Sequence, residues 1–339
     1  MASSENEQAA AESRALTRRG FLRGVGLGGL AGAAGMGGSR ALGRLGDEAY
    51  PGGIGSSEVH ADPTDLYGGI VDVPSWAGSS SLDAVTFPSP ESASEYEFDV
   101  TEQRLEVGAG AFVDAWVYGG SVPGPLIRAR EGDRVRIRLR NLTPHPHSLH
   151  LHGRHAPAMD GWEPIPPGGE FVYEIEAAPA GVHPYHCHTA PLAEHIRRGL
   201  YGMMIVDPRE GRPAATEVAL LISGFTIGDR PNAVVAWNGV AGYYDRYPIK
   251  VATGEPIRLY LVNMVEGEPL ASFHLHSQTF GVIPSGMGDR PIWYGDVIPM
   301  TQGERAILEF VLPEEGRYMF HPHQHHLAMR GAMGWFAAV

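Results

Sequence analysis

The segment VHPYHCHTAP, residues 182–191, contains the only cysteine of this 339-residue chain, Cys187, between His186 and His188. A disulfide needs a second cysteine, and a cysteine buried for packing alone needs no histidine neighbours. Two interpretations of these ten residues are open, a chance cluster and a zinc site built from histidine and cysteine. The positions of the other histidines distinguish between them.

Fifteen of the sixteen histidines fall into four short windows, and each window holds an H-x-H motif. The windows are HPHSLHLHGRH (145–155), HPYHCHTAPLAEH (183–195), FHLHSQ (273–278) and FHPHQHH (320–326), and their motifs are His150/His152, His186/His188, His274/His276 and His321/His323. Residues two apart on a strand project from the same face, so each pair can hold one metal region. Eight imidazoles are too many for a zinc hydrolase, which has three protein ligands and an open position.

The hydrophobic pattern between these windows predicts an all-β fold. Apolar and polar side chains alternate in DRVRIRLRNL (133–142) and EFVYEIEA (170–177), and again in EPIRLYLVNM (255–264) after the polar connector PREGRPAATE (208–217). No long segment has helical periodicity, and 45 glycines and 27 prolines suit a chain with many turns. Because both halves repeat one plan, we predict two tandem Greek-key β-sandwich domains at 95–208 and 217–339.

The N-terminal part of the chain predicts export. Arg18 and Arg19 precede a short stretch rich in glycine and alanine, a pattern typical of a twin-arginine signal within residues 1–44. We therefore expect a periplasmic or extracellular protein. Residues 45–94 are a segment rich in Gly, Ser and Pro that precedes the domains. The net charge of −13 argues against a nucleic acid as partner.

The alternation of side-chain direction along a strand explains why a cysteine lies between two histidines. If His186 and His188 point to one face, Cys187 points to the other and is free to bind a second metal. A thiolate with two imidazoles in a trigonal array is the ligand set of a blue copper site, and His147 and His195 are the candidate imidazoles. Zinc fits such a site too, but zinc has no redox chemistry and needs no covalent link to a second centre.

Four segments of the chain resemble the multicopper oxidases, specifically the small two-domain members whose blue copper lies in the first domain. They are SVPGPLIRAREGD (121–133), HSLHLHG (147–153), YHCHTAPLAEHIRRGLYG (185–202) and FHLHSQTF (273–280). The resemblance runs from about residue 118 to the C-terminus. It implies cupredoxin-like domains and copper as the cofactor, with one type 1, one type 2 and two type 3 ions in each active unit.

The resemblance also implies which residues hold each copper. Type 1 copper would be held by His147, Cys187 and His195, and type 2 copper by His150 and His274. The type 3 pair would be held by His152, His186, His188, His276, His321 and His323. Electrons would pass from type 1 copper through Cys187 to His186 and His188, which makes these three residues the catalytic relay.

The sequence departs from the family pattern at two places. Leu200 stands where a weak methionine ligand of type 1 copper often sits, with Met203 as the alternative sulfur, and an apolar axial residue favours Cu(I). In the second domain, Ala271 and Pro322 replace the histidine and cysteine, so no second blue site is expected. Asp160 and Asp289 follow H-x-H segments and are either proton donors or turn residues. No metal role is assigned to His145, His155, His183, His325 or His326.

The activity that the resemblance implies is that of a laccase-like oxidase. A phenol, an aromatic amine or a metal ion would supply single electrons, and dioxygen would be reduced to water. The resemblance implies a homotrimer in which the first domain of one subunit meets the second domain of the next, so that the trinuclear cluster lies between subunits. Two alternatives stay open: a copper-containing nitrite reductase, which needs fewer cluster histidines, and a copper-binding or electron-transfer protein without catalysis.

Overall fold

The computed structural model describes residues 95–339. The predicted signal at 1–44 and the segment at 45–94 lie outside this range. Within it, no helix has both the length and the apolar character that a membrane span requires.

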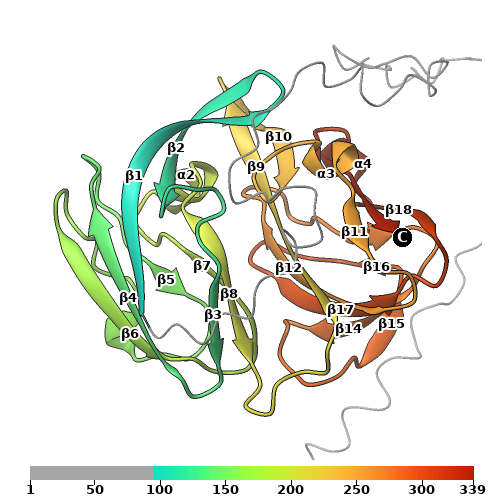
Figure 1. The fold of residues 1–339 in the computed structure, drawn as a ribbon. Helices are drawn as coiled ribbons and strands as arrows, with labels where there is room; N and C mark the ends of the chain where they lie inside the picture. The colour runs from blue at the N-terminus through green and yellow to red at the C-terminus, as the bar shows by residue number, and fades with distance from the viewer. Residues whose placement is uncertain (1–94) are drawn as a thin grey trace, which may run out of the picture. The chain divides into compact units, whose positions relative to one another are not determined.

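The first domain contains two four-stranded sheets, with strand orders β2-β1-β4-β6 and β3-β8-β7-β5. Figure 1 colours these strands from blue-green to yellow-green. They are β1 (Glu95–Gly108), β2 (Ala111–Tyr118), β3 (Ile127–Arg130), β4 (Arg134–Asn141), β5 (His150–Leu151), β6 (Glu170–Glu176), β7 (Gly181–His186) and β8 (Tyr201–Asp207). Two short helices, η4 (Pro157–Met159) and α2 (Leu192–Arg197), lie in the connections.

The second domain contains sheets with strand orders β10-β9-β12-β17-β14-β15 and β11-β19-β18-β13-β16. Their strands are β9 (Thr216–Ile227), β10 (Arg230–Trp237), β11 (Ile249–Val251), β12 (Pro256–Met264), β13 (Phe273–Leu275), β14 (Phe280–Pro284), β15 (Trp293–Gly295), β16 (Val297–Ile298), β17 (Arg305–Val311), β18 (Gly316–His321) and β19 (Gly334–Ala338). The short helices are α3 (Tyr243–Arg246) and α4 (His325–Ala328).

Both domains use the same strand pairing. The parallel pair β1–β4 and the antiparallel pair β4–β6 correspond to β9–β12 and β12–β17. The antiparallel pairs β5–β7 and β13–β18 also correspond, and their registers place His150 opposite His186 and His274 opposite His321. The repeated sequence plan is therefore a repeated fold, and in each copy the first histidines of the two H-x-H motifs lie opposite each other on neighbouring strands.

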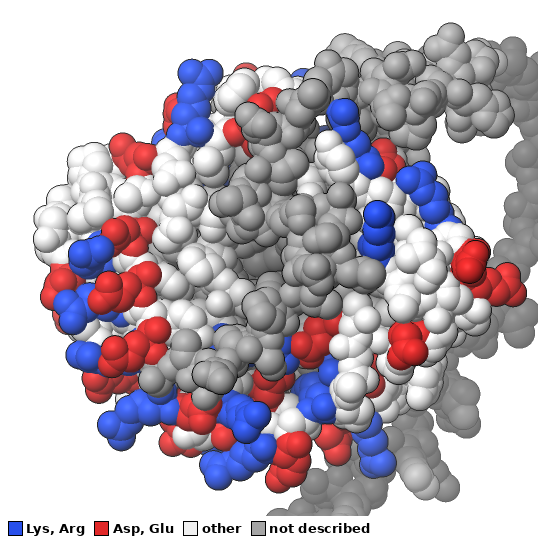
Figure 2. Space-filling view, in the orientation of Figure 1, with Lys and Arg blue, Asp and Glu red and all other residues white. Residues whose placement is uncertain are grey.

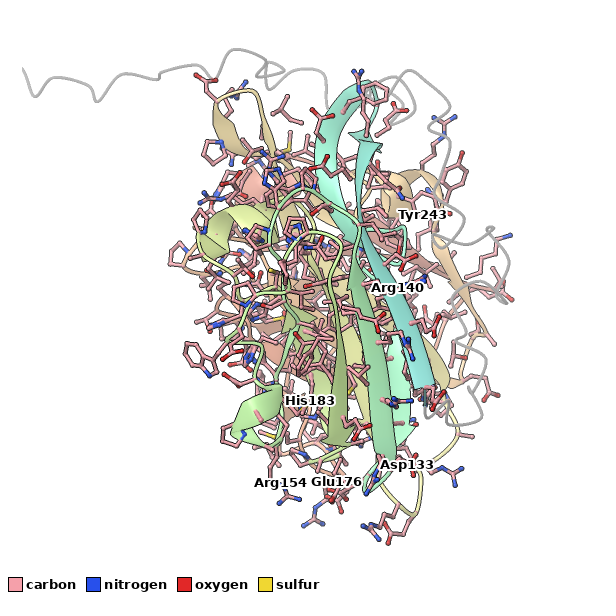
Figure 3. All side chains as sticks on the ribbon, turned by 90° about the vertical axis from the view of Figure 1, so that its left-hand side faces the viewer. Asp133, Arg140, Arg154, Glu176, His183 and Tyr243 are labelled. Carbon is pink, nitrogen blue, oxygen red and sulfur yellow. The ribbon has the colours of Figure 1, made fainter. Side chains whose placement is uncertain are left out.

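Strand β4 shows why the alternating pattern folds as it does. Val135, Ile137 and Leu139 are completely buried in the core of the first domain. The arginines of the other face form cross-strand ion pairs. Arg136 pairs with Glu174 on β6 at 3.2 Å. Arg140, labelled in Figure 3, forms an exposed pair with Asp99 on β1 at 2.7 Å. Figure 2 shows positive and negative side chains intermixed over this sheet, at the left of the view.

The domains share a third apolar cluster in addition to their own cores. Strand β12 contributes Leu259 and Leu261 to the core of the second domain, whereas Tyr260 and Val262 belong to the shared cluster. Strand β8 divides in the same way, with Met204 in the core of the first domain and its neighbours in the shared cluster. These strands are buried on both faces, so their sequences are almost continuously apolar.

A buried ion network joins the two domains beside this cluster. The guanidinium of Arg128 on β3 donates to Asp207 at 2.7 Å and to Glu217 on β9 at 2.6 Å. Glu217 also accepts a hydrogen bond from the Tyr260 hydroxyl at 2.6 Å and lies 3.4 Å from Arg258. Burial acts to raise the pKa of Glu217, but these partners outweigh it and lower the pKa below its usual value. The stability that this carboxylate contributes is therefore lost as the pH falls through its lowered pKa.

Replacing Glu217 with Gln should destabilise the chain strongly, because two buried guanidinium groups lose their shared carboxylate. Removing one partner of a buried ion pair typically costs about 3–5 kcal/mol. Urea unfolding of the copper-free protein measures the change. Asp99→Asn is the matched control, since it breaks the exposed pair with Arg140 and should shift the unfolding midpoint little. Equal midpoints for the two variants would contradict this account of the network.

Candidate metal centres

The cysteine and its flanking histidines point to opposite sides of the strand end, as predicted. The Cys187 thiol is fully buried, belongs to the core of the first domain, and lies 3.2 Å from Nδ1 of His195. His186 faces the other way, with its Nε2 3.2 Å from Nε2 of His152. Two separate groups of possible ligands therefore meet at adjacent residues of one backbone.

The first group consists of His147, Cys187 and His195, whose ligand atoms all lie within 4.8 Å of one another. Nδ1 of His147 and Nδ1 of His195 are 3.2 Å apart. Burial, followed by the neighbouring histidines, lowers the pKa of His147 to about 3, so its imidazole is neutral and able to bind a metal. The backbone N–H groups of Ser148 and Thr189 donate to the Cys187 sulfur at 3.4 and 3.5 Å. One soft and two nitrogen ligands in a dry site fit copper.

Leu200 lies beside this group. It is fully buried in the same core as Cys187, and the Cys187 N–H donates to its carbonyl at 3.0 Å. Met203 points to the opposite face of β8, into the cluster shared by the two domains. The structure therefore places Leu200, and not Met203, on the side of the thiolate.

The second group brings together the histidines of both motifs of the first domain. The rings of His152, His186 and His188 each lie 5.2 Å from the ring of His150. Burial lowers the pKa of His152 to about 3 and that of His186 to about 4, with further lowering from neighbouring histidines. Uncharged imidazoles packed this closely, with ring nitrogens facing one another, are a suitable ligand set for metal ions.

The histidines of the second domain form the corresponding third group. The rings of His276, His321 and His323 lie 4.7, 5.4 and 5.4 Å from the ring of His274, and the Nε2 atoms of His276 and His321 are 2.9 Å apart. In the described part of the chain, no ring contact joins a histidine of the second group to one of the third. Each domain thus presents four imidazoles as a separate half-site.

Backbone carbonyls orient several of these rings. His186 and His321 each place Nδ1 next to the carbonyl of the following residue, at 2.9 and 2.8 Å, and His274 places Nδ1 2.8 Å from the carbonyl of Asp296. A carbonyl only accepts a hydrogen bond, so Nδ1 carries the proton and the Nε2 lone pair is free for a metal.

Asp160 belongs to the second group, although sequence reasoning left it undecided. Its backbone carbonyl lies 3.0 Å from Nδ1 of His150, and its carboxylate lies 3.3 Å from the same atom and 3.5 Å from Nε2 of His155. The MDGW motif gave the signal, but a turn aspartate has the same appearance in a sequence. Asp289, the corresponding candidate of the second domain, lies in an exposed turn.

The position in the second domain that corresponds to the cysteine site is filled by other residues. Ala271 and Pro322 replace the histidine and cysteine, and the Ser272 N–H donates to the side-chain oxygen of Gln324 at 2.8 Å, where the Ser148 N–H of the first domain donates to sulfur. His326 pairs with Glu268 at 3.4 Å. The described residues of this domain contain no cysteine-histidine group.

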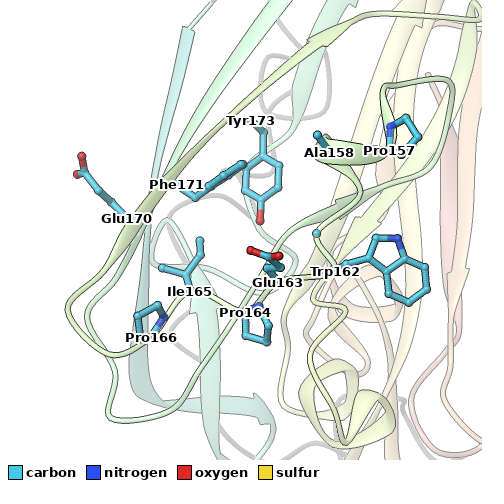
Figure 4. Close-up of a pocket in the computed structure, with 11 residues that line it drawn as sticks. Pro157, Ala158, Trp162, Glu163, Pro164, Ile165, Pro166, Glu170, Phe171 and Tyr173 are labelled. Carbon is cyan, nitrogen blue, oxygen red and sulfur yellow. The ribbon is translucent and has the colours of Figure 1, made fainter.

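An apolar cavity of about 470 Å³ lies near the cysteine site (Figure 4). Trp162, Ile165, Phe171 and Tyr173 line it, and Glu163 is the acidic side chain that Figure 4 shows below the tyrosine hydroxyl. Its link to the metal ligands is a backbone one, because the N–H of Ile165 donates to the carbonyl of His147 at 2.7 Å.

Comparison with known proteins agrees with this geometry. Family models described as multicopper oxidase match residues 90–211 and 216–339. A crystal structure of a multicopper oxidase is 40% identical with a TM-score of 0.70, covering 72% of this chain and 88% of that one. The blue copper oxidase from Nitrosomonas europaea is 27% identical with a TM-score of 0.65, covering 72% and 85%. A copper-containing nitrite reductase of Neisseria meningitidis is 27% identical over 292 residues, covering 75% of this chain and 74% of the relative.

The two matched models together span both β-sandwich domains and every histidine group described above. The predicted all-β architecture of two tandem cupredoxin-like domains is confirmed, and the histidine and cysteine clusters are copper-binding sites. The chain belongs to the multicopper oxidase family and is a two-domain copper oxidoreductase.

Proposed function

We propose that the protein couples one-electron oxidation of a reductant to the four-electron reduction of dioxygen to water. The observation that supports this most directly is the pair of complete four-imidazole half-sites, one of which is joined to a buried thiolate through Cys187. When bound, copper supplies one-electron redox chemistry at the cysteine site and oxygen reduction at the histidine cluster.

The chain's own residues connect and tune these sites. Cys187 joins the two centres through the backbone to His186 and His188, which gives electrons a short covalent path. The N–H groups of Ser148 and Thr189 hydrogen-bond to its sulfur and hold it in place as a ligand. Asp160 orients His150 and places a carboxylate at the open side of the half-site, next to a cavity of about 420 Å³, where it is positioned to hold a proton. Within the cluster, we assign His150 and His274 to type 2 copper and the other six imidazoles to the type 3 pair.

Nitrite reduction is the second candidate function, since a relative in Neisseria meningitidis carries that name at 27% identity. A nitrite reductase uses a single copper ion at the histidine site and has no use for an imidazole after the cysteine. Here His188 follows Cys187, and its ring lies 5.2 Å from that of His150. The complete set of eight imidazoles favours dioxygen.

Copper content and acceptor use test this proposal together. We expect about four copper ions per chain and oxygen uptake with water as product when a phenol, Cu(I) or Fe(II) is supplied. His188→Ala should remove the uptake and lower the copper content but leave the colour of the cysteine site, because His188 lies outside that group. His325→Ala is the matched control and should change neither property. Turnover of nitrite without oxygen uptake would reverse the choice of acceptor, and one copper per chain would indicate a carrier.

We also propose that the two half-sites meet between subunits of a homotrimer. The half-site of the second domain is open to solvent, with His276 and His323 exposed. Large apolar side chains lie exposed next to both half-sites: Trp162 contacts the ring of His188 at 4.8 Å, and Ile292 and Tyr294 precede the Asp296 that orients His274. Contact of one kind of face with the other closes into a ring when the rotation permits.

Mixing two inactive variants tests this assembly. His152→Ala damages only the first-domain half-site, and His276→Ala only the second-domain half-site. Coexpressed in equal amounts, they should recover about a quarter of the wild-type activity, because that share of randomly formed head-to-tail interfaces pairs two intact halves. Each variant alone should be inactive. Mixed oligomers, verified by mass, that show no recovery would place the cluster within one chain.

The axial position offers a separate prediction. Leu200→Met should place a thioether on the side of the thiolate and stabilise Cu(II), lowering the reduction potential by about 59 mV or more, which corresponds to a tenfold change in a one-electron equilibrium. A redox titration of the visible absorption band measures the potential. Met203→Leu is the control and should leave the potential unchanged, since Met203 faces the shared cluster. A larger effect of Met203→Leu would show that the axial assignment is wrong.

A further inference from the structure

We propose that electrons enter the protein through the indole of Trp116, from a small hydrophilic reductant held in the cavity beside it. This inference rests on the proposed redox function of the cysteine site, and it names the place where the reductant acts. Trp116 lies in β2, outside every motif that marks the family resemblance at the metal ligands.

The imidazoles of the cysteine site do not reach the solvent. His147 is 0% exposed and His195 is 3% exposed, so a reductant in solution cannot touch either ring. The ring of Trp116 packs against both, with centroid distances of 4.9 Å to His147 and 4.8 Å to His195. The indole is therefore the aromatic group that both metal-binding imidazoles share on this side.

Trp116 is itself only 5% exposed, and the accessible part of its side chain lines a polar cavity. Its Nε1–H donates to Glu102 at 3.0 Å, and the guanidinium of Arg198 lies 4.5 Å from its ring, so the indole is fixed in place. The cavity measures about 310 Å³, and charged side chains of both signs line it, namely Glu102, Arg104, Asp114 and Arg198. A space of this size and polarity suits a single small hydrophilic molecule.

The proposed electron transfer needs no oxidant or reductant beyond the bound copper and the reductant itself. The reductant loses one electron, and a hydroquinone-type reductant also releases a proton to water in the open cavity. With copper bound, the electron would cross the indole to the imidazole of His147 or His195, and the copper held there would accept it. The indole begins and ends the step in the same oxidation state, so it acts as a bridge and not as a consumed group.

The apolar cavity of Figure 4 is the competing place of entry. Its connection to the cysteine site passes through saturated and backbone atoms, in the hydrogen bonds between Ile165 and His147. Tyr173, in its wall, hydrogen-bonds to the N–H of Leu149, and none of the described ring contacts joins it to His147 or His195. Trp162 in the same wall contacts the ring of His188, which belongs to the histidine cluster and not to the cysteine site. A reductant there has no aromatic contact with His147 or His195, so we infer entry at Trp116.

Anaerobic stopped-flow reduction of the copper-loaded protein tests the role of the indole. Loss of the visible band with ascorbate or hydroquinone should slow at least about tenfold in Trp116→Leu, equivalent to roughly 1.4 kcal/mol of barrier, and much less in Trp116→Phe, which keeps a ring. The reduction potential and the paramagnetic resonance spectrum of the site should stay unchanged in both variants. These readouts separate a slower electron path from a damaged site.

Trp335 provides a matched control in the second domain. Its Nε1–H also donates to a carboxylate, that of Asp245 at 2.8 Å, and Arg317 lies over its ring at 5.7 Å. No metal-binding imidazole contacts it among the described residues. Trp335→Leu should leave the reduction rate unchanged. An unchanged rate in Trp116→Leu would overturn the proposal, and a faster rate would show that the indole is a barrier.

A charge change in the cavity tests the docking site without touching Trp116. Asp114→Lys should speed reduction by anionic ascorbate and slow reduction by cationic hexaammineruthenium(II), each about two- to fivefold at low salt, with the difference shrinking at high salt. Glu163→Lys, at the apolar cavity, should affect neither reductant. If Glu163→Lys changes these rates and Asp114→Lys does not, the entry point is the apolar cavity. Because no acceptor is present, these rates hold whether the reduced enzyme then uses dioxygen or nitrite.

Discussion

The arrangement of both metal centres depends on the alternating side-chain directions of residues 186–188, where strand β7 ends. This alternation sends the thiolate of Cys187 into the core of the first domain and the two imidazoles into a half-site on the opposite side. A helix would place three successive side chains around its axis and separate the two sets. The covalent link between a mononuclear site and a histidine cluster is thus a direct consequence of strand geometry.

Duplication of the domain supplies the second requirement, which is the number of ligands. One H-x-H pair on each of two neighbouring strands gives four imidazoles, and the register that sets His150 opposite His186 is repeated by His274 and His321. Only the first of the two described domains has the cysteine-histidine group. In the other, Gln324 accepts the hydrogen bond that a sulfur would accept, so the site closed without leaving a buried N–H unpaired.

The sequence predicted the parts of this structure that depend on local periodicity. Strand alternation, the repeated plan and the opposite directions of Cys187 and its neighbours follow from spacing alone. Asp160 and Trp116 could not be assigned in this way, because their roles come from contacts over long distances in the chain. Trp116 meets His195 only after the β1–β2 hairpin has packed on the loop that contains α2, and no motif encodes that packing. Which of Leu200 and Met203 lies beside the cysteine site likewise depends on the side to which each side chain points, which only the structure shows.

Burial of the cysteine site keeps the ligands dry but also keeps a dissolved reductant away from them. A dry environment keeps His147 uncharged and excludes water from the thiolate, which favours Cu(I) and protects a reactive sulfur. The same burial removes any direct contact between a dissolved reductant and the ligands. On the proposed entry route, the indole of Trp116, itself only 5% exposed, bridges the polar cavity and the imidazoles of His147 and His195. Arg198 and Glu102 hold that ring in place against both imidazoles.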